Sequence, residues 1–216
     1  DGYASIATNS ILFLGYGDTW QPADNIVMRM PAVAAIYVPL DGMNECGLCV
    51  ADLIEIDGEA VHQTTGKTPI TTVAAIRLML DYAANVEEAI TLLQQYDMHS
   101  SMNVAHHFAL CDTTGKYAVV EYVDNQLVVT ESIACTNHRL TCSAHPTDTA
   151  LQPAISNSHL RLEQLLTAPN SKSLLNSMQD VAFDGWTRWS VIFNPNQKQA
   201  TYYFKADFST PYTIEL

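Results

Sequence analysis

The sequence predicts an α+β protein in which a mostly antiparallel sheet system has its helices segregated outside it. Two observations support this class. The predicted elements follow the order strands, two helices, strands, two helices and strands, and polar turns separate most of the strand segments. No internal repeat or low-complexity tract is found. We expect a single domain over residues 1–216, because typical domains have roughly 100 to 200 residues.

The first part of the chain predicts strands and a hairpin. Residues 4–7 and 11–14 have strand composition. Residues 33–38 and 46–56 flank Asp41-Gly42, a pair that favours a tight hairpin turn. We therefore expect two paired strands in a buried sheet, with the turn at Asp41 and Gly42.

Two amphipathic helices are predicted next. The first spans residues 72–84, where apolar side chains recur at helical spacing: Val73, Ile76, Leu80 and Ala84. The second starts at Asn85, which is followed three residues later by Glu88 in a near capping box. Together the two helices are expected to cover one face of the sheet.

The rest of the chain predicts an antiparallel meander, a loop, two helices and a final group of strands. The meander comprises residues 107–111, 117–123 and 126–134. A polar loop follows at 137–153, and long loops in compact domains are often functional. Helices are expected at 158–166 and 171–181, a hairpin at 189–194 and 201–205, and a last strand at 212–216.

Composition excludes several function classes. A formal charge of -13 argues against a nucleic-acid or anionic-membrane partner. The longest apolar run, residues 31–40, is far shorter than the ~20 residues of a membrane span. Five cysteines at irregular positions favour reduced thiols, and therefore a cytoplasmic location, over a disulfide scaffold.

No metal site or cofactor is expected. Cys46 and Cys49 have C-x-x-C spacing, but both lie at the start of a predicted strand rather than at a helix start, and Cys135 and Cys142 form no second short-spaced pair. His106 and His107 are strand neighbours that point to opposite faces, so we expect one buried and one exposed histidine. The remaining histidines have no metal-binding spacing, and no G-x-S-x-G nucleophile elbow occurs.

Two polar positions are candidates for a site. Asn137 lies at the end of a predicted strand, where a side-chain donor is held rigidly. Arg161 places a cation in the first turn of a helix, against the preference of the helix dipole, so it needs a partner or a purpose. A turn-forming asparagine and a solvated arginine are the ordinary alternatives.

Taken in order, several segments resemble the linear amide C–N hydrolases, or choloylglycine hydrolase family. This family includes the bile salt hydrolases, penicillin V acylases and acyl-coenzyme A:6-aminopenicillanic acid acyltransferases. The resemblance runs nearly end to end and is carried by residues 40–45, Gly47-Leu48, 86–89, 119–122, Thr136-Asn137, Arg161, 189–191 and 202–204. It implies the N-terminal nucleophile hydrolase fold, a four-layer αββα sandwich, here incomplete at the N-terminus.

The resemblance also implies a chemistry and a site. An N-terminal cysteine attacks a linear amide while its own α-amino group handles the proton, giving hydrolysis or acyl transfer. By resemblance Asn137 binds the oxyanion, Arg161 has a supporting cationic role, and the backbone near Ile54 supplies a second donor. The expected partner is a small N-acyl substrate, such as an acyl-amino acid, a conjugated bile acid or a β-lactam side chain.

One departure from the family pattern stands out. Family members begin with the nucleophilic cysteine, whereas this sequence begins at Asp1 and none of its five cysteines has an α-amino group. We therefore expect missing strands upstream, with this chain a truncated form, a proteolytic product or one subunit of a split protein, inactive as given. Exposed sheet edges would then favour a homo-oligomer. The alternatives are a catalytically inactive relative that binds an amide ligand, and a metal-dependent hydrolase that uses the histidines.

Overall fold

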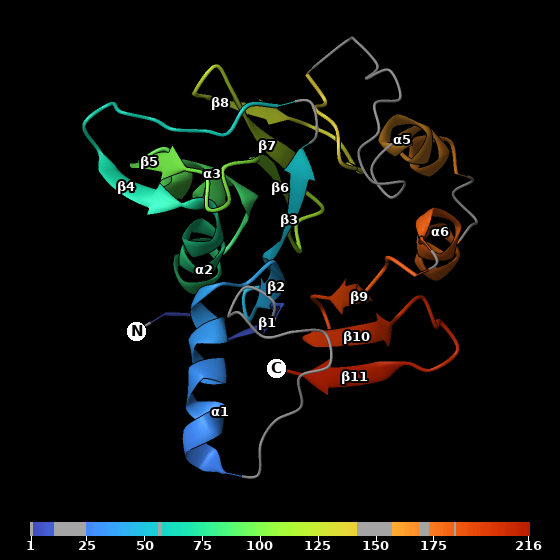
Figure 1. Cartoon of the computed structure of the whole chain (residues 1–216). Coiled ribbons are helices and arrows are strands. Elements are labelled where there is room, and N and C mark those ends of the chain that lie inside the picture. Colours follow the sequence, from blue (N-terminus) through green and yellow to red (C-terminus); the bar gives the residue numbers. More distant parts are fainter. Residues whose placement is uncertain (1, 11–24, 56–57, 142–156, 169–172, 184) are drawn as a thin grey trace.

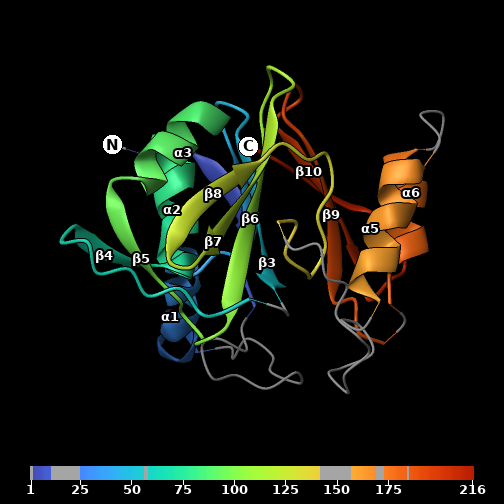
Figure 2. The same cartoon turned by 90° about the horizontal axis from the view of Figure 1, so that it is seen from above.

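The computed structural model places four layers side by side (Figures 1 and 2). Helices α2 (Thr72–Tyr82) and α3 (Val86–Leu93) cover one face of a six-stranded sheet, whose other face looks toward a three-stranded sheet. Helices α5 (Ser158–Thr167) and α6 (Leu174–Val181) lie outside that second sheet. The structure describes residues 2–10, 25–55, 58–141, 157–168, 173–183 and 185–216. The predicted strand at 11–14 and most of the predicted loop at 137–153 fall outside these residues.

The six-stranded sheet is antiparallel throughout, in the order β1-β2-β3-β6-β7-β8. Its strands are β1 (Ser5–Thr8), β2 (Asp41–Asn44), β3 (Cys49–Glu55), β6 (Ala105–Cys111), β7 (Tyr117–Val123) and β8 (Gln126–Thr130). The predicted meander is confirmed as β6, β7 and β8. β2 pairs only with the first half of β3, from Cys49 to Ala51. The second half of β3 therefore has an edge that β2 does not cover.

The opening hairpin exists, but its predicted turn is wrong. Asp41 and Gly42 lie inside β2, and the turn falls at Glu45 and Cys46, with Gly47 at a φ of 91°. Gly42 lies in extended backbone where neighbouring atoms leave no room for a side chain: a Cβ would lie 2.7 Å from Leu80 Cδ1 and 2.8 Å from a backbone oxygen of β1. A glycine is therefore required here by close packing and not by a turn.

The strand predicted at 33–38 is also wrong. Helix α1 (Ile26–Val33) and the 3₁₀ helix η2 (Ala34–Tyr37) occupy this segment. A short apolar run has no periodicity that separates strand from helix, and here the helical conformation prevails. Leu40 still contacts the sheet, because its N–H donates to Thr8 O at 2.8 Å and its carbonyl accepts from Asp52 N at 2.8 Å.

The core lies between the six-stranded sheet and the two helices that cover it. Both helices appear where the sequence predicts them, and Ile76, Met79, Leu80 and Leu93 are buried against Phe108. The predicted cap is confirmed, since Asn85 Oδ1 accepts from the Glu88 N–H at 3.0 Å. The Glu88 carboxylate in turn accepts from the Ala84 N–H at 2.8 Å, which satisfies a further backbone donor before the helix.

The second sheet and the outer helices also follow the prediction. Its strands are β9 (Trp189–Asn194), β10 (Gln199–Phe204) and β11 (Tyr212–Glu215), paired antiparallel in the order β11-β10-β9. The sequence prediction missed a parallel pair, β4 (Thr68–Thr71) and β5 (Tyr96–His99), beside α2 and α3. Among the described helices, none has the length and hydropathy required to cross a bilayer.

Candidate functional site

The structure brings together the three residues that the resemblance implicates. Asn137 Nδ2 donates to Ile54 O at 2.9 Å, and Arg161 Nη2 donates to Asn137 Oδ1 at 2.9 Å. Because a guanidinium can only donate, Arg161 fixes the orientation of the Asn137 amide, with its oxygen toward α5 and its NH₂ toward β3. A strand end, a helix and a strand edge that are distant in sequence thus meet at one point.

The Ile54 backbone faces this same point. Asp52 directs its N–H to Leu40 O, on the β2 side of β3. Residues two apart on a strand direct their backbone groups to the same edge, and the N–H and C=O of one residue point the same way. Ile54 therefore directs its N–H, like its carbonyl, toward the uncovered edge where Asn137 lies.

A buried hydrogen-bond network positions Asn137 against α5. Thr136 Oγ1 donates to Ser158 O at 2.8 Å, and the Ser158 hydroxyl contacts Thr136 Oγ1 at 2.9 Å and His138 Nδ1 at 2.9 Å. All three residues are buried. The residues on either side of Asn137 are therefore tied to the first turn of the helix that carries Arg161.

Arg161 has the partners that its unusual place in the helix requires. Besides its hydrogen bond to Asn137, its guanidinium carbon lies 5.3 Å from the centre of the Phe183 ring, within cation–π range. Burial lowers the pKa of Arg161 from its ordinary value, although the side chain stays charged at neutral pH. The cation is therefore half-buried and paired, and is not a fully solvated surface charge.

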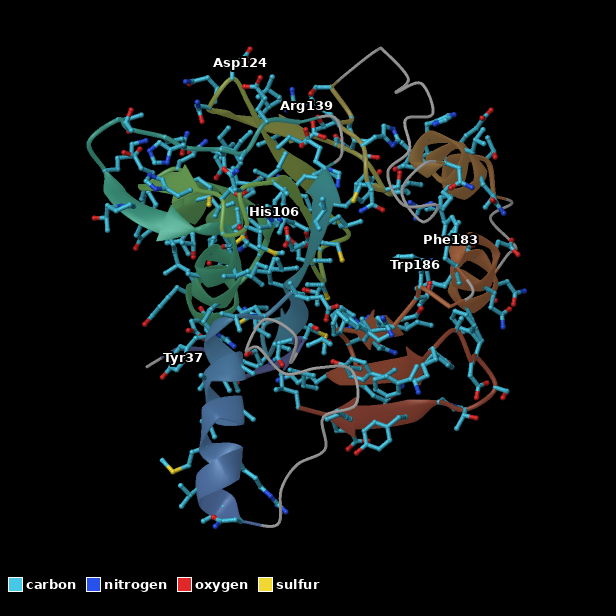
Figure 3. The ribbon with its side chains drawn as sticks, viewed as in Figure 1. Tyr37, His106, Asp124, Arg139, Phe183 and Trp186 are labelled. Carbon is cyan, nitrogen blue, oxygen red and sulfur yellow. The ribbon has the colours of Figure 1, made fainter. Side chains whose placement is uncertain are left out.

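A cavity of about 430 Å³ lies beside Asn137 and the uncovered edge of β3. Its walls combine apolar and aromatic side chains with five polar or charged ones. The lining residues include Leu53, Ile54, Val73, Met102, Trp186 and Trp189, together with Asp41, Asp52, His106, Asn137 and Arg188. Figure 3 labels His106 on the six-stranded sheet and Trp186 on the segment after α6. This size and lining are typical of a small-molecule site.

Asp41 joins the two sheets at this cavity. Its Oδ2 accepts from Trp189 Nε1 at 2.8 Å, which links β2 to β9. Burial raises the pKa of Asp41 to about 6, even though the hydrogen bond from the indole acts in the opposite direction. The Asp-Gly pair predicted to form a turn therefore contributes a buried carboxyl to the cavity wall.

Asp52 and His106 form a second polar pair in the same wall, which the sequence did not predict. His106 Nδ1 lies 3.1 and 3.0 Å from the two carboxylate oxygens of Asp52, and the two side chains are 2% and 3% exposed. The expectation of one buried and one exposed histidine is wrong, because His107 is also buried, on the opposite face. No sequence signal identified the pair, since Asp52 and His106 meet through diagonal strand register: Asp52 lies opposite Phe108, and His106 opposite Ile54.

Residues 36–207 match the sequence pattern of the family described as acyl-coenzyme A:6-aminopenicillanic acid acyl-transferase. The chain belongs to this family. The match spans most of the sequence and includes Ile54, Asn137 and Arg161. No curated protein matches the chain.

Several solved structures resemble this acyl-transferase family member. Two variants of conjugated bile acid hydrolase from Clostridium perfringens are 18% and 17% identical, with TM-scores of 0.57 and 0.60, over 82% and 83% of this chain and 73% of each of theirs. Penicillin V acylase from Agrobacterium tumefaciens is 20% identical, with a TM-score of 0.54, over 83% of this chain and 66% of its own. The likeness shows the fold, which is the predicted N-terminal nucleophile hydrolase fold.

One cluster in this family member has residues that could hold a metal. Ligand atoms of Glu55, His107 and Glu121 lie within 4.8 Å of one another, and all three residues are buried. Arg139 Nε already donates to Glu55 Oε1 at 2.6 Å, and the Leu140 N–H donates to Glu121 Oε1 at 2.6 Å. The Arg139 guanidinium thus supplies positive charge beside this cluster, while Glu55 Oε2 and His107 Nε2 have no hydrogen-bond partner among the described residues.

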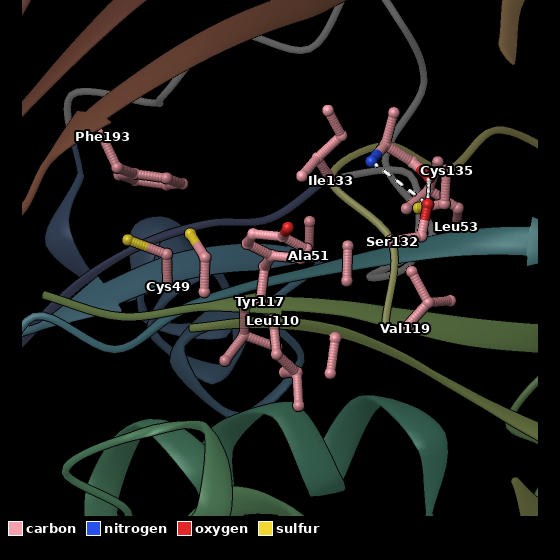
Figure 4. Close-up of a pocket in the computed structure, with 15 residues that line it drawn as sticks. Cys49, Ala51, Leu53, Leu110, Tyr117, Val119, Ser132, Ile133, Cys135 and Phe193 are labelled. Carbon is pink, nitrogen blue, oxygen red and sulfur yellow. Dashed lines mark hydrogen bonds between the residues drawn. The ribbon is translucent and has the colours of Figure 1, made fainter. Parts of the chain in front are cut away.

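Among the described residues, none of the cysteines lines the cavity beside Asn137. Cys49, Cys111 and Cys135 line a separate apolar cavity of about 300 Å³, on the face of the six-stranded sheet that looks toward Phe193 of β9 (Figure 4). Cys49 and Cys111 are directly opposite each other on β3 and β6. Cys46 lies in the hairpin turn, so the C-x-x-C spacing does not form a helix-start redox site. Cys142 and His145 lie outside the described residues.

Proposed function

We propose that this protein cleaves or transfers the acyl group of a small N-acyl compound bound in the cavity beside Asn137. The observation that carries the proposal is the convergence of Asn137, Arg161 and the Ile54 backbone at one end of that cavity. An amide NH₂ has two N–H groups, and Asn137 uses one of them on Ile54 O. The second, together with the Ile54 N–H, is suited to bind the oxyanion that forms when an amide carbonyl is attacked.

Arg161 would make this donor effective before substrate arrives. A donor held in place needs no reorganisation during the reaction, and one such donor in acyl transfer contributes about 3 kcal/mol. The hydrogen bond from Arg161 to Asn137 Oδ1 prevents the Asn137 side-chain amide from rotating and exchanging its oxygen and nitrogen. Its positive charge also adds to the electrostatic stabilisation of a developing negative charge.

The nucleophile in this proposal is an N-terminal cysteine thiol, with its α-amino group as the base, as the family resemblance implies. These 216 residues do not include such a cysteine. The three thiols that line the second cavity are not offered as substitutes, because none has an α-amino group. The chain therefore provides the oxyanion-binding side and the substrate cavity.

Substrate class follows from the cavity and from the similar structures. Walls of tryptophan and aliphatic side chains favour an apolar or aromatic acyl group of modest size. The similar structures include, by name, a conjugated bile acid hydrolase and a penicillin V acylase. We propose a compound of the same kind, a small molecule with a linear amide, as substrate.

The test is an acyl-release assay on the complete gene product. Purified protein is incubated with a panel of N-acyl-amino acids, glycine-conjugated bile acids and penicillin V, and free amine and acid are followed by mass spectrometry. Release from at least one substrate, abolished by iodoacetamide, supports the proposal. If the complete protein carries an N-terminal cysteine and binds these substrates but releases no amine or acid, the enzymatic proposal is overturned in favour of an inactive amide-binding protein.

A further inference from the structure

The pair of Asp52 and His106 has no part in the proposed oxyanion chemistry, yet both side chains line the same cavity as Asn137. Buried imidazoles in a protein core are usually fully hydrogen-bonded. His106 is only half satisfied: Nδ1 contacts Asp52, whereas the buried Nε2 has no hydrogen-bond partner among the described residues. A half-satisfied imidazole in the wall of a ligand cavity needs a physical explanation.

The Asp52 carboxylate determines whether His106 Nε2 can donate or accept a hydrogen bond. An ionised carboxylate only accepts hydrogen bonds, so the ring nitrogen facing both Asp52 oxygens carries the proton. In the neutral ring the other nitrogen, Nε2, is then an acceptor. A buried acceptor left unsatisfied is unfavourable, and a ligand that donates a hydrogen bond to it would recover that loss.

We propose that Asp52 orients His106 so that Nε2 accepts an N–H or O–H from the ligand in this cavity, which makes the pair a specificity determinant. The preferred ligand has an apolar or aromatic body that packs on walls such as Trp186 and Val73, and a neutral hydrogen-bond donor. His106 is opposite Ile54 in the strand register, so the acceptor and the proposed oxyanion donors come from neighbouring positions of one sheet. The inference rests on the proposed function only in placing the ligand in this cavity.

The test is a binding measurement with matched probes. N-benzylacetamide has an amide N–H, and N-benzyl-N-methylacetamide lacks it; benzyl alcohol and benzyl methyl ether form a second pair. Dissociation constants come from titrations followed by ¹H–¹⁵N NMR. We expect each donor compound to bind about tenfold more tightly than its methylated partner, since one recovered hydrogen bond contributes about 1.4 kcal/mol. Equal affinities within both pairs would overturn the proposal.

Two variants separate recognition from structural damage. His106→Phe keeps the ring volume without an acceptor, and Asp52→Asn keeps the side-chain shape but no longer fixes the tautomer. Both are expected to lose the tenfold preference while retaining binding of the methylated probes; Asp124→Asn, in the exposed turn between β7 and β8, should retain the preference. A preference that survives in a folded His106→Phe protein contradicts the proposal.

The ring itself gives a readout that needs no variant. Nitrogen-15 spectra of wild-type protein should show His106 protonated at Nδ1 and unprotonated at Nε2, with the Nε2 shift moving when N-benzylacetamide binds. Protonation at Nε2, alone or together with Nδ1, would overturn the proposal. The results also separate this proposal from the proposed function. Donor preference without acyl release would overturn only the enzymatic proposal. Acyl release without donor preference would overturn only the role of Asp52 and His106 in ligand specificity.

Discussion

Arg161 Nη2 donates to Asn137 Oδ1 at 2.9 Å, and this contact fixes the direction of an amide whose nitrogen faces the uncovered edge of β3. The two residues come from opposite sides of a long connection, and Thr136, His138 and Ser158 bind the two segments together beneath them. The hydrogen bonds that the proposed oxyanion donor requires are thus already present in the structure.

Replacing Arg161 should disturb turnover more than substrate affinity. Arg161→Met keeps the length of the side chain but loses its charge and its donors, so the Asn137 amide is free to turn. We expect acyl release to fall about 10- to 100-fold, because a hydrogen bond to a charged group contributes about 1.5–3 kcal/mol. Arg29→Met, on exposed α1, is the matched control and should retain the wild-type rate. An Arg161→Met protein with the wild-type rate would show that the contact has no catalytic role.

The free energy of unfolding should depend on pH through the titration of Asp41. Burial raises its pKa to about 6 in the folded protein, from an ordinary value of 3.8. Between these values the folded protein binds the proton that the unfolded chain has released, so this group's contribution to stability falls as pH rises from about 4 to about 6. The loss is at most about 3 kcal/mol.

Asp41→Asn removes this titration while its amide oxygen can still accept from Trp189. We expect the variant to exceed the wild type in free energy of unfolding at pH 7, and the difference to vanish near pH 4. Urea denaturation across that range measures it. A difference that does not change with pH would mean that Asp41 does not titrate with a raised pKa.

Much of the fold was predictable because its signals are local. Helical periodicity identified α2 and α3, and polar turns identified the meander and the final hairpin. The hairpin turn was predicted at the wrong place, because Gly42 is required by the approach of Leu80, a tertiary contact, and not by a turn. For the site, Asn137 and Arg161 were predicted from family resemblance, while Asp52 and His106 are 54 positions apart and depend on strand register.

The Asn44 side chain stabilises the hairpin between β2 and β3 through four hydrogen bonds. This buried side chain donates to Leu80 O and Ala83 O, at 3.1 and 2.7 Å, and its Oδ1 accepts from Cys46 N and Leu48 N, both at 3.1 Å. Asn44→Leu would leave four backbone groups without this partner, and we expect a loss of about 3 kcal/mol or more in unfolding free energy. Asn176→Ala, on exposed α6, should change stability by less than about 0.5 kcal/mol. A loss for Asn44→Leu no larger than that of the control would contradict this role.

The thiols around the apolar cavity should differ in reactivity. A hydrogen bond with Cys49 lowers the pKa of the exposed Cys111, whereas the same contact and burial raise the pKa of Cys49, and burial raises that of Cys135 to about 12. Brief treatment with iodoacetamide at pH 7, followed by peptide mapping, should label Cys111 well before the other two. Denatured protein should be labelled at all three. Equal labelling of Cys49 and Cys111 in folded protein would contradict the assignment.

The most direct test of the account is the effect of Asn137→Ala on the kinetics of acyl release by the complete gene product. If Asn137 is an oxyanion donor, kcat should fall about 100- to 1,000-fold while KM changes little, because the lost interaction forms only as charge develops on the substrate oxygen. A folded Asn137→Ala protein with wild-type kcat, or one in which KM alone rises, would contradict it.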